Sequence, residues 1–328
     1  MKTRKSEPRP GEFELIEKLF VPLASAPGAL NLTDDVAVLA APAGFDVLLT
    51  TDTIVESVDF FRDDPADAVA QKALRVNLSD LAAKGAQPDG YLLTLLLPEW
   101  PDLAWLKSFV LGLARDQAEF GLSLMGGDMS STTGPLAISV AAYGLVPSGA
   151  MIRRAGARPG DCVFVSGTVG DSGGGLSVLK GEAAAGAHDR LITRYRMPVP
   201  RLALGQALRG VASAALDISD GLIADLDHLA RASGVGIAID AARIPLSPDL
   251  LSLWGDNLDT RCRAATAGDD YEIAFTATAA NRDVVMETAR RSGTAVSEIG
   301  RVETGSGVRV LDPAGKEIRL SHKGFTHF

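Results

Sequence analysis

The chain has 328 residues, of which 46% are hydrophobic and 22% charged, and its formal net charge is −9. This is the composition of a globular protein, and the length predicts two domains. The negative charge excludes general nucleic-acid binding, and no apolar run is long enough to span a bilayer. The only cysteines, Cys162 and Cys262, lack the spacing of zinc ligands and are too few for a disulfide-rich scaffold. The N-terminus has no signal-peptide pattern, so we expect a cytoplasmic protein.

The first half of the chain alternates predicted helices and strands. Hydrophobic spacing predicts an amphipathic helix over 12–20. The elements expected after it are strands over 36–39 and 47–51, helices over 64–81 and 103–120, and strands over 92–97, 122–125 and 136–146. The strand over 122–125 runs into a predicted loop, Gly126-Gly127-Asp128. The alternation indicates an α/β or α+β domain.

Proline and glycine between residues 147 and 160 place a domain boundary near residue 150. The elements expected after it are strands over 162–166, 214–218, 237–239, 272–275 and 308–311, and helices over 176–180, 201–208, 222–232 and 282–291. Residues 183–187 read as a loop or a helix end. The second half is therefore also predicted to be α/β.

Several apolar runs end in acidic residues. The run from Val47 ends in Thr50, Thr51 and Asp52, and the others end at Asp34-Asp35, Asp80, Asp128, Asp217 with Asp220, and Asp269-Asp270. Carboxylates brought together repel unless hard cations neutralise them, which favours magnesium bound with nucleotide phosphates. Helix capping is the alternative for any single aspartate, but it does not account for the whole set.

A second motif points to a different chemistry. Gly170-Asp171-Ser172-Gly173-Gly174 matches the G-x-S-x-G elbow of serine hydrolases, with His228 or His322 as the candidate base. The surrounding glycines favour a simpler interpretation, a flexible turn whose backbone amides could face a phosphate. Neither a Walker A pattern nor a G-x-G-x-x-G after a strand is present.

The chain resembles the thiamine-monophosphate kinase family, within the superfamily that includes aminoimidazole ribonucleotide synthetase. The resemblance runs from Gly11 to the tail at Phe328, and the order and spacing of its motifs carry it. The motifs are Asp34-Asp35, Thr51-Asp52-Thr53, the run from Val76 to Leu81, Gly126-Gly127-Asp128, Arg154-Ala155-Gly156-Ala157, Ser166-Gly167, the run from Asp217 to Leu222, and the run from Gly268 to Glu272.

The resemblance implies a two-domain PurM-like fold. Residues 1–150 would form an AIR-synthase-like α/β domain that binds ATP and magnesium and carries a dimer-forming sheet. Residues 151–328 would form the AIR-synthase-like C-terminal α/β domain. The implied reaction is the direct in-line transfer of the γ-phosphoryl group of ATP to thiamine monophosphate, giving thiamine diphosphate and ADP, by a homodimer that needs several Mg²⁺ ions.

The resemblance also implies roles for individual residues. Asp52, Asp128 and Arg154 are expected to be catalytic, and Gly127, Asp128, Arg154 and Ser219 to contact the nucleotide. The expected magnesium ligands are Asp35, Thr50, Thr51, Asp52, Asp80, Asp128, Asp217 and Asp220. The expected substrate contacts are Asp59, Asp269 and Phe325.

Two positions depart from the family pattern. The family usually has histidine where this chain has Asp59, and glutamate where it has Asp269. We favour tolerated substitutions; the alternative is a substrate-shifted or non-catalytic relative that binds ATP and magnesium. Selenophosphate synthetase would need a reactive cysteine near the N-terminus, and this chain has none before Cys162. The hydrogenase-maturation relative would need a C-terminal cysteine, and this sequence ends in Thr326-His327-Phe328. Aminoimidazole ribonucleotide synthetase fits the length and the terminal aromatic segment less well.

Overall fold

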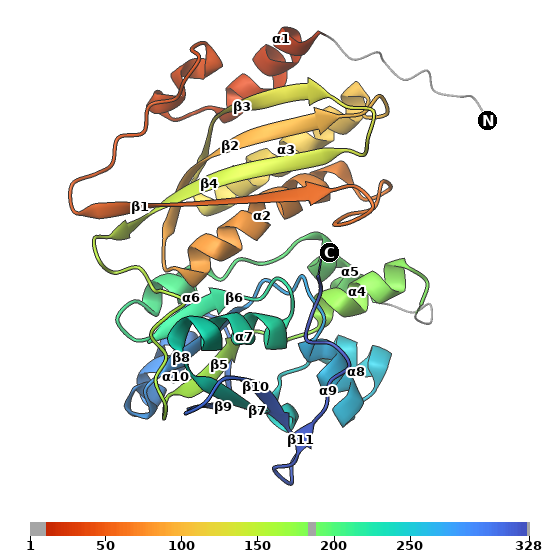
Figure 1. Ribbon diagram of the computed structural model, residues 1–328. Coiled ribbons are helices and arrows are strands. Elements are labelled where there is room, and N and C mark those ends of the chain that lie inside the picture. The colour runs from red at the N-terminus through yellow and green to blue at the C-terminus, as the bar shows by residue number, and fades with distance from the viewer. Residues whose placement is uncertain (1–10, 183–187, 327–328) are drawn as a thin grey trace. The chain divides into compact units, whose positions relative to one another are not determined.

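The computed structural model describes residues 11–182 and 188–326. It divides into two compact units: unit 1 comprises Met1–Leu78 and Gln87–Ser148, and unit 2 comprises Ser79–Ala86 and Gly149–Phe328. Both units are mixed α/β, as predicted (Figure 1). The loop predicted over 183–187 lies outside the described residues. Within the described part of the chain, no helix has the length and apolarity needed to cross a membrane.

Unit 1 is built on a four-stranded sheet in the order β1-β4-β2-β3, in which only β2 and β3 run parallel. Figure 1 shows α2 and α3 along one face of this sheet. Its elements are α1 (Glu12–Leu15), η1 (Ile16–Phe20), η2 (Val21–Leu23), η3 (Pro27–Leu32), β1 (Phe45–Val55), α2 (Ala66–Ala83), β2 (Gln87–Leu97), α3 (Leu103–Phe120), β3 (Ser123–Ser131) and β4 (Ala137–Pro147). The end of α2, from Ser79, belongs to unit 2.

Local sequence signals explain the clearest boundaries of unit 1. The Asp102 carboxylate accepts the Trp105 amide at 2.8 Å and begins α3, and Gly121, at a φ of 72°, ends it. In β2, Tyr91, Leu93 and Leu95 are buried while Leu92 and Leu96 are exposed, so one face of the sheet is left uncovered.

Two predictions in unit 1 are wrong. Residues 36–39 are not a strand within the described chain: Val36 and Val38 are exposed, and the Val38 amide donates to the Gly28 carbonyl. Gly126-Gly127-Asp128 is not a loop, because β3 continues through it to Ser131 and pairs with β2.

Unit 2 holds a seven-stranded sheet in the order β11-β10-β7-β9-β5-β8-β6. Its strands are β5 (Cys162–Ser166), β6 (Ala214–Asp217), β7 (Gly236–Asp240), β8 (Ile273–Ala277), β9 (Val296–Glu303), β10 (Gly307–Leu311) and β11 (Glu317–Ile318). Its helices are α4 (Asp171–Leu179), α5 (Asp189–Arg196), α6 (Leu202–Ala207), α7 (Leu222–Ser233), η4 (Ala241–Arg243), α8 (Pro248–Trp254), α9 (Leu258–Ala265), η5 (Ala279–Asn281) and α10 (Arg282–Ser292).

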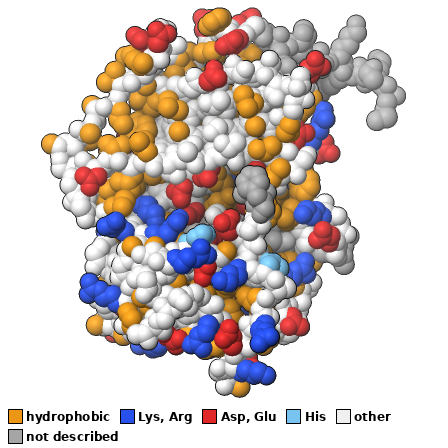
Figure 2. Space-filling view, viewed as in Figure 1, with side chains coloured by type: hydrophobic (Ala, Val, Ile, Leu, Met, Phe, Trp, Pro, Cys, Tyr) orange, Lys and Arg blue, Asp and Glu red, His pale blue; other side chains and the backbone are white. Residues whose placement is uncertain are grey.

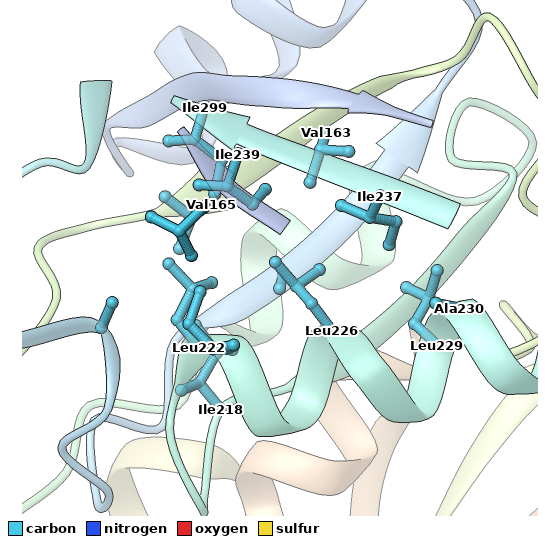
Figure 3. Packing of buried hydrophobic residues seen from close by; sticks show 14 of the residues in the cluster. Val163, Val165, Ile218, Leu222, Leu226, Leu229, Ala230, Ile237, Ile239 and Ile299 are labelled. Carbon is cyan, nitrogen blue, oxygen red and sulfur yellow. The ribbon is translucent and has the colours of Figure 1, made fainter. Parts of the chain in front are cut away.

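The main core of unit 2 lies between α7 and the sheet. Leu222, Leu226 and Leu229 recur at helical spacing on one side of α7 and pack with strand residues that include Val163, Ile237 and Ile299 (Figure 3). This packing fixes the start of α7, and with it the polar segment that connects β6 to α7.

Candidate active site

Unit 1 gathers three of the predicted site residues around a cavity of about 670 Å³. Asp35, Gly127 and Asp128 line it together with Asp34, and most of the remaining lining is apolar. A cavity with an apolar wall and a few carboxylates at one side is typical of a small-molecule site.

Backbone packing accounts for the glycine beside Asp128. A Cβ atom on Gly127 would lie 1.8 Å from the carbonyl oxygen of Leu93, so a side chain there would push β3 away from β2. The register between these strands also shifts between Tyr91 and Leu92. The close approach holds Asp128 opposite Thr94.

The polar side chains of β1 point alternately to the two faces of the sheet. Side chains alternate along a strand, so Thr51 shares the face of Leu49, whereas Thr50 and Asp52 project from the opposite face. Asp128 pairs with Thr94 and lies on the face that Leu92 occupies, the face of Thr51. Within unit 1 the sheet therefore brings Thr51 and Asp128 to one face and does not bring Asp52 there.

Asp59 is engaged within its own turn after β1. Its carboxylate accepts the Val55 amide at 2.8 Å, and its carbonyl accepts the ammonium of the almost fully buried Lys72 at 2.7 Å. A carboxylate in this position has a local role in closing the turn, which is consistent with a tolerated substitution.

In unit 2, the segment from Ile218 to Gly221 is held from both sides. One oxygen of Asp225, in the first turn of α7, accepts the amides of Ser219, Asp220 and Gly221, each at 3.1 Å. The carbonyls point the other way: those of Ile218, Ser219 and Asp220 accept the amides of Tyr271, Asp269 and Phe325. The segment that carries Ser219 and Asp220 thus has a defined conformation.

The same bonds bring two predicted substrate residues to this segment. Asp269 has a φ of 68°, a left-handed conformation that aspartate tolerates better than most residues. The half-exposed Phe325 is preceded by Gly324, where a Cβ atom would lie 2.6 Å from the Asp220 carbonyl. Ser219, Asp220, Asp269 and Phe325 therefore come together in unit 2.

A second group in unit 2 consists of Asp80, Asp217, Lys84 and Arg154. Burial and the nearby charge of Asp80 raise the pKa of Asp217 well above its usual value. Burial lowers the pKa of Lys84, which Asp217 and Asp80 attract and Arg154 repels. Two predicted magnesium ligands and one predicted nucleotide contact thus share one electrostatic environment.

The carboxylates of Asp80 and Asp217 are the kind of oxygen donor that magnesium prefers, but the described side chains do not form a complete metal site by themselves. In residues 11–182 and 188–326, no group of three or more His, Cys, Asp or Glu side chains could hold a metal ion. Magnesium commonly takes only one or two carboxylates and fills its octahedron with water and phosphate oxygens. Asp80 and Asp217 suit that mode of binding.

The prediction of a flexible turn after β5 is wrong, because α4 begins at Asp171 and includes Ser172, Gly173 and Gly174. This glycine-rich segment is also neither of the two sites considered for it. The amides of Gly170 and Ser172 donate to the buried Asp270 carboxylate, so they are not available to bind a phosphate. The Ser172 hydroxyl is buried and has no hydrogen-bond partner among the described residues, so no base activates it. The neighbouring Glu272 is buried and holds Arg194 and Arg201.

The sequence interpretation did not include Asp225 and Lys84. An acidic residue in the first turn after Gly221 was the available signal for Asp225, since it can accept amides at a helix start. Lys84 had the weaker signal of lying four residues after Asp80, just beyond the end of the helix predicted over 64–81.

Comparison with known proteins identifies relatives along almost the whole chain. Residues 33–146 match the AIR synthase related protein, N-terminal domain, and residues 158–312 match its C-terminal domain. Thiamine-monophosphate kinase from Caulobacter vibrioides is 42% identical over 322 residues, which cover 97% of this chain and 91% of that protein. Thiamine-monophosphate kinase from Escherichia coli strain K12 is 40% identical over 324 residues, covering 97% and 98%. The structure of AaThiL complexed with AMPPCP and TMP is 36% identical, with a TM-score of 0.77 and 97% of each chain covered.

Proposed function

Because the chain belongs to the thiamine-monophosphate kinase family of AIR synthase related proteins, and is an ATP-dependent phosphotransferase, we propose that it phosphorylates thiamine monophosphate to thiamine diphosphate. The observation that carries the proposal is the match, over 97% of each chain, to AaThiL complexed with AMPPCP and TMP. The two groups of charged residues in unit 2 support it independently, because phosphoryl transfer needs fixed carboxylates and a cation.

We assign the residues as the family resemblance implies. Residues 1–150 act as the ATP- and magnesium-binding domain and 151–328 as the second domain. Gly127, Asp128, Arg154 and Ser219 bind the nucleotide, and Asp59, Asp269 and Phe325 lie toward the acceptor. The proposed magnesium ligands are Asp35, Thr50, Thr51, Asp52, Asp80, Asp128, Asp217 and Asp220.

The proposed mechanism is direct in-line transfer. An oxygen of the acceptor phosphate is already ionised at neutral pH, so it attacks the γ-phosphorus without a dedicated base. The bond between the γ-phosphorus and the β-phosphate oxygen of ATP breaks, and ADP leaves. Magnesium held by the proposed carboxylate ligands would neutralise the phosphate charge. The chain's own residues hold donor and acceptor in line, and the Arg154 guanidinium stabilises charge on the transferring group.

Turnover of the purified protein with ATP, magnesium and thiamine monophosphate tests the proposal, with thiamine diphosphate followed by chromatography. We expect product from the wild-type chain and from Asp63→Asn, an exposed control in unit 1, and none from Asp52→Asn or Asp128→Asn. Product from both site variants at the wild-type rate would contradict the residue assignment.

The departures from the family pattern at Asp59 and Asp269 define the second candidate, a substrate-shifted or non-catalytic relative that binds ATP and magnesium. Such a protein would bind magnesium and AMPPCP but form no thiamine diphosphate. If that is the outcome, Asp59→His becomes the deciding variant, and restored turnover would place the loss at this position.

A further inference from the structure

Lys84 occupies a position that neither the family resemblance nor the proposed mechanism uses. It follows the last turn of α2, where its amide donates to the Asp80 carbonyl at 3.2 Å. Its ammonium donates to the carbonyl of Ala215 on β6 at 2.8 Å, two residues before Asp217. The side chain thus spans from the helix that carries Asp80 to the strand that carries Asp217.

The backbone around Lys84 keeps this geometry in place. The Ile152 amide donates to the Lys84 carbonyl at 3.2 Å, and the Ala215 amide donates to the Arg153 carbonyl at 3.0 Å. Gly85 turns the chain immediately after Lys84 with a φ of 72°. The lysine is therefore held beside β6 within unit 2.

Two carboxylates near each other in partly buried surroundings are costly unless a cation is present. An ammonium has three donors, and the Ala215 carbonyl accepts from one of them, so two donors remain for the acids. Asp80 lies one helical turn before Lys84, and Asp217 shares its side of β6 with Ala215, so the geometry places the ammonium between the positions of the two acids.

We propose that the Lys84 ammonium is a built-in counter-cation of the Asp80–Asp217 pair, which allows unit 2 to fold with these two carboxylates near each other before magnesium binds. The inference rests on the proposed function only where it treats Asp80 and Asp217 as magnesium ligands. Magnesium and Lys84 then neutralise the same charge, so removing the lysine makes the fold depend more strongly on the metal.

Thermal unfolding of the full chain in EDTA and in excess MgCl₂ tests the proposal. We expect Lys84→Met to lower the apparent Tm in EDTA by at least about 3 °C and to regain most of that loss in MgCl₂. Lys84→Arg keeps the charge and should follow the wild type. Lys180→Met removes a lysine at the C-terminal end of α4 and should show no change in the magnesium response.

A double-mutant cycle separates charge neutralisation from the bond to Ala215. Lys84→Met should cost less in an Asp80→Asn background, because only one carboxylate then remains. If Lys84→Met does not fold alone, folding of the double variant supports the proposal and failure of both overturns it. An equal loss of Tm in EDTA and MgCl₂, or a Lys84→Arg variant that behaves like Lys84→Met, also overturns it.

The same experiment distinguishes this inference from the proposed function. If MgCl₂ raises the Tm of neither the wild type nor any of the variants, the assignment of Asp80 and Asp217 to magnesium fails. The comparison of Lys84→Met with Lys84→Arg in EDTA, and the cycle with Asp80→Asn, would still decide whether Lys84 neutralises the pair.

Discussion

Arg154 differs from Lys84 in its exposure, although the two cations are close enough for Arg154 to lower the pKa of Lys84 by repulsion. Arg154 is exposed and Lys84 is partly buried beside β6. A long, planar, exposed guanidinium can reach a phosphate and bind two of its oxygens, whereas the tethered ammonium is confined to its carboxylates. This difference assigns the two cations to different tasks.

Arg154→Ala is therefore expected to lower kcat by about 100-fold or more, the usual effect of removing a group that stabilises developing charge. Steady-state kinetics of thiamine diphosphate formation measures it. The matched control is Arg153→Ala, which removes the neighbouring exposed side chain and should keep the wild-type kcat. Full turnover of Arg154→Ala would remove Arg154 from the mechanism.

Asp225 gives the folded chain a pH dependence. Burial and the charge of Asp220 raise its pKa to about 7, although three amides favour the ionised form. Because the folded state holds the proton more tightly than the unfolded state, the contribution of Asp225 to stability is complete below pH 4 and is lost as pH rises through about 7.

We therefore expect the free energy of unfolding of the wild type, relative to Asp225→Asn, to fall between pH 5 and 7, by up to about 1.4 kcal/mol per pH unit. Denaturant unfolding in EDTA measures this difference. Asp161→Asn is the control, because Asp161 is also buried and accepts an amide at 3.0 Å but does not touch the segment before α7. A difference that does not vary with pH would contradict the assignment.

At the scale of elements, the connection between β6 and α7 links the two sides of the proposed reaction. Its amides bind α7 through Asp225, and its carbonyls bind the segments that carry Asp269 and Phe325. The residues that we propose for nucleotide and acceptor binding are thereby held by one short stretch of backbone. Precise positioning of this kind is the main requirement for phosphoryl transfer.

The pairing of β2 and β3 supports a prediction for unit 1. Gly127→Ala should lower the free energy of unfolding by about 1–3 kcal/mol and reduce turnover, because its Cβ would displace backbone next to Asp128. Gly126→Ala is the adjacent control, since its Cβ would meet only the movable Leu92 side chain at 3.3 Å. Denaturant unfolding and turnover should separate the variants, and equal behaviour would contradict the close approach at Gly127.

At the scale of the whole molecule, we propose that the uncovered face of the unit 1 sheet, beside the cavity that Leu49 and Leu92 also line, would form the interface of the homodimer that the family resemblance implies. Leu49, Leu92 and Leu96 are exposed on it, and Figure 2 shows hydrophobic side chains over this face of unit 1. Exposed apolar groups of this kind mark interaction surfaces.

Leu96→Glu should therefore convert a dimer into a monomer, because it buries a charge in the interface. Size-exclusion chromatography with light scattering measures the mass. Leu111→Glu is the control, since Leu111 is exposed on α3, on the helical side of the sheet, and should leave the dimer intact. A monomeric wild type, or a dimeric Leu96→Glu, would contradict this interface.

The sequence by itself determined most elements of this protein, since the signals for them are local. Hydrophobic spacing and caps predicted α3 from Leu103 to Phe120, and the apolar runs predicted β1, β2, β4 and β5. It missed α5, α8, α9, β9 and β11. The three helices are short, β11 has only two residues, and charged residues interrupt the apolar pattern of β9. It also assigned 36–39 to a strand, because an apolar run does not reveal whether a partner strand exists.

For the candidate site, the order of motifs was sufficient to identify the family, but not the neighbours of each residue. Only the tertiary structure decided that Thr51 and Asp52 face opposite sides of a sheet, that Asp270 occupies the amides of the glycine loop, and that Lys84 lies beside the strand of Asp217. Lys84 and Ala215 are 131 positions apart in the chain, and no local pattern encodes such a contact. The contact exists because the end of α2, from Ser79 onward, belongs to unit 2 together with β6. Burial there strengthens the interactions between the charged side chains.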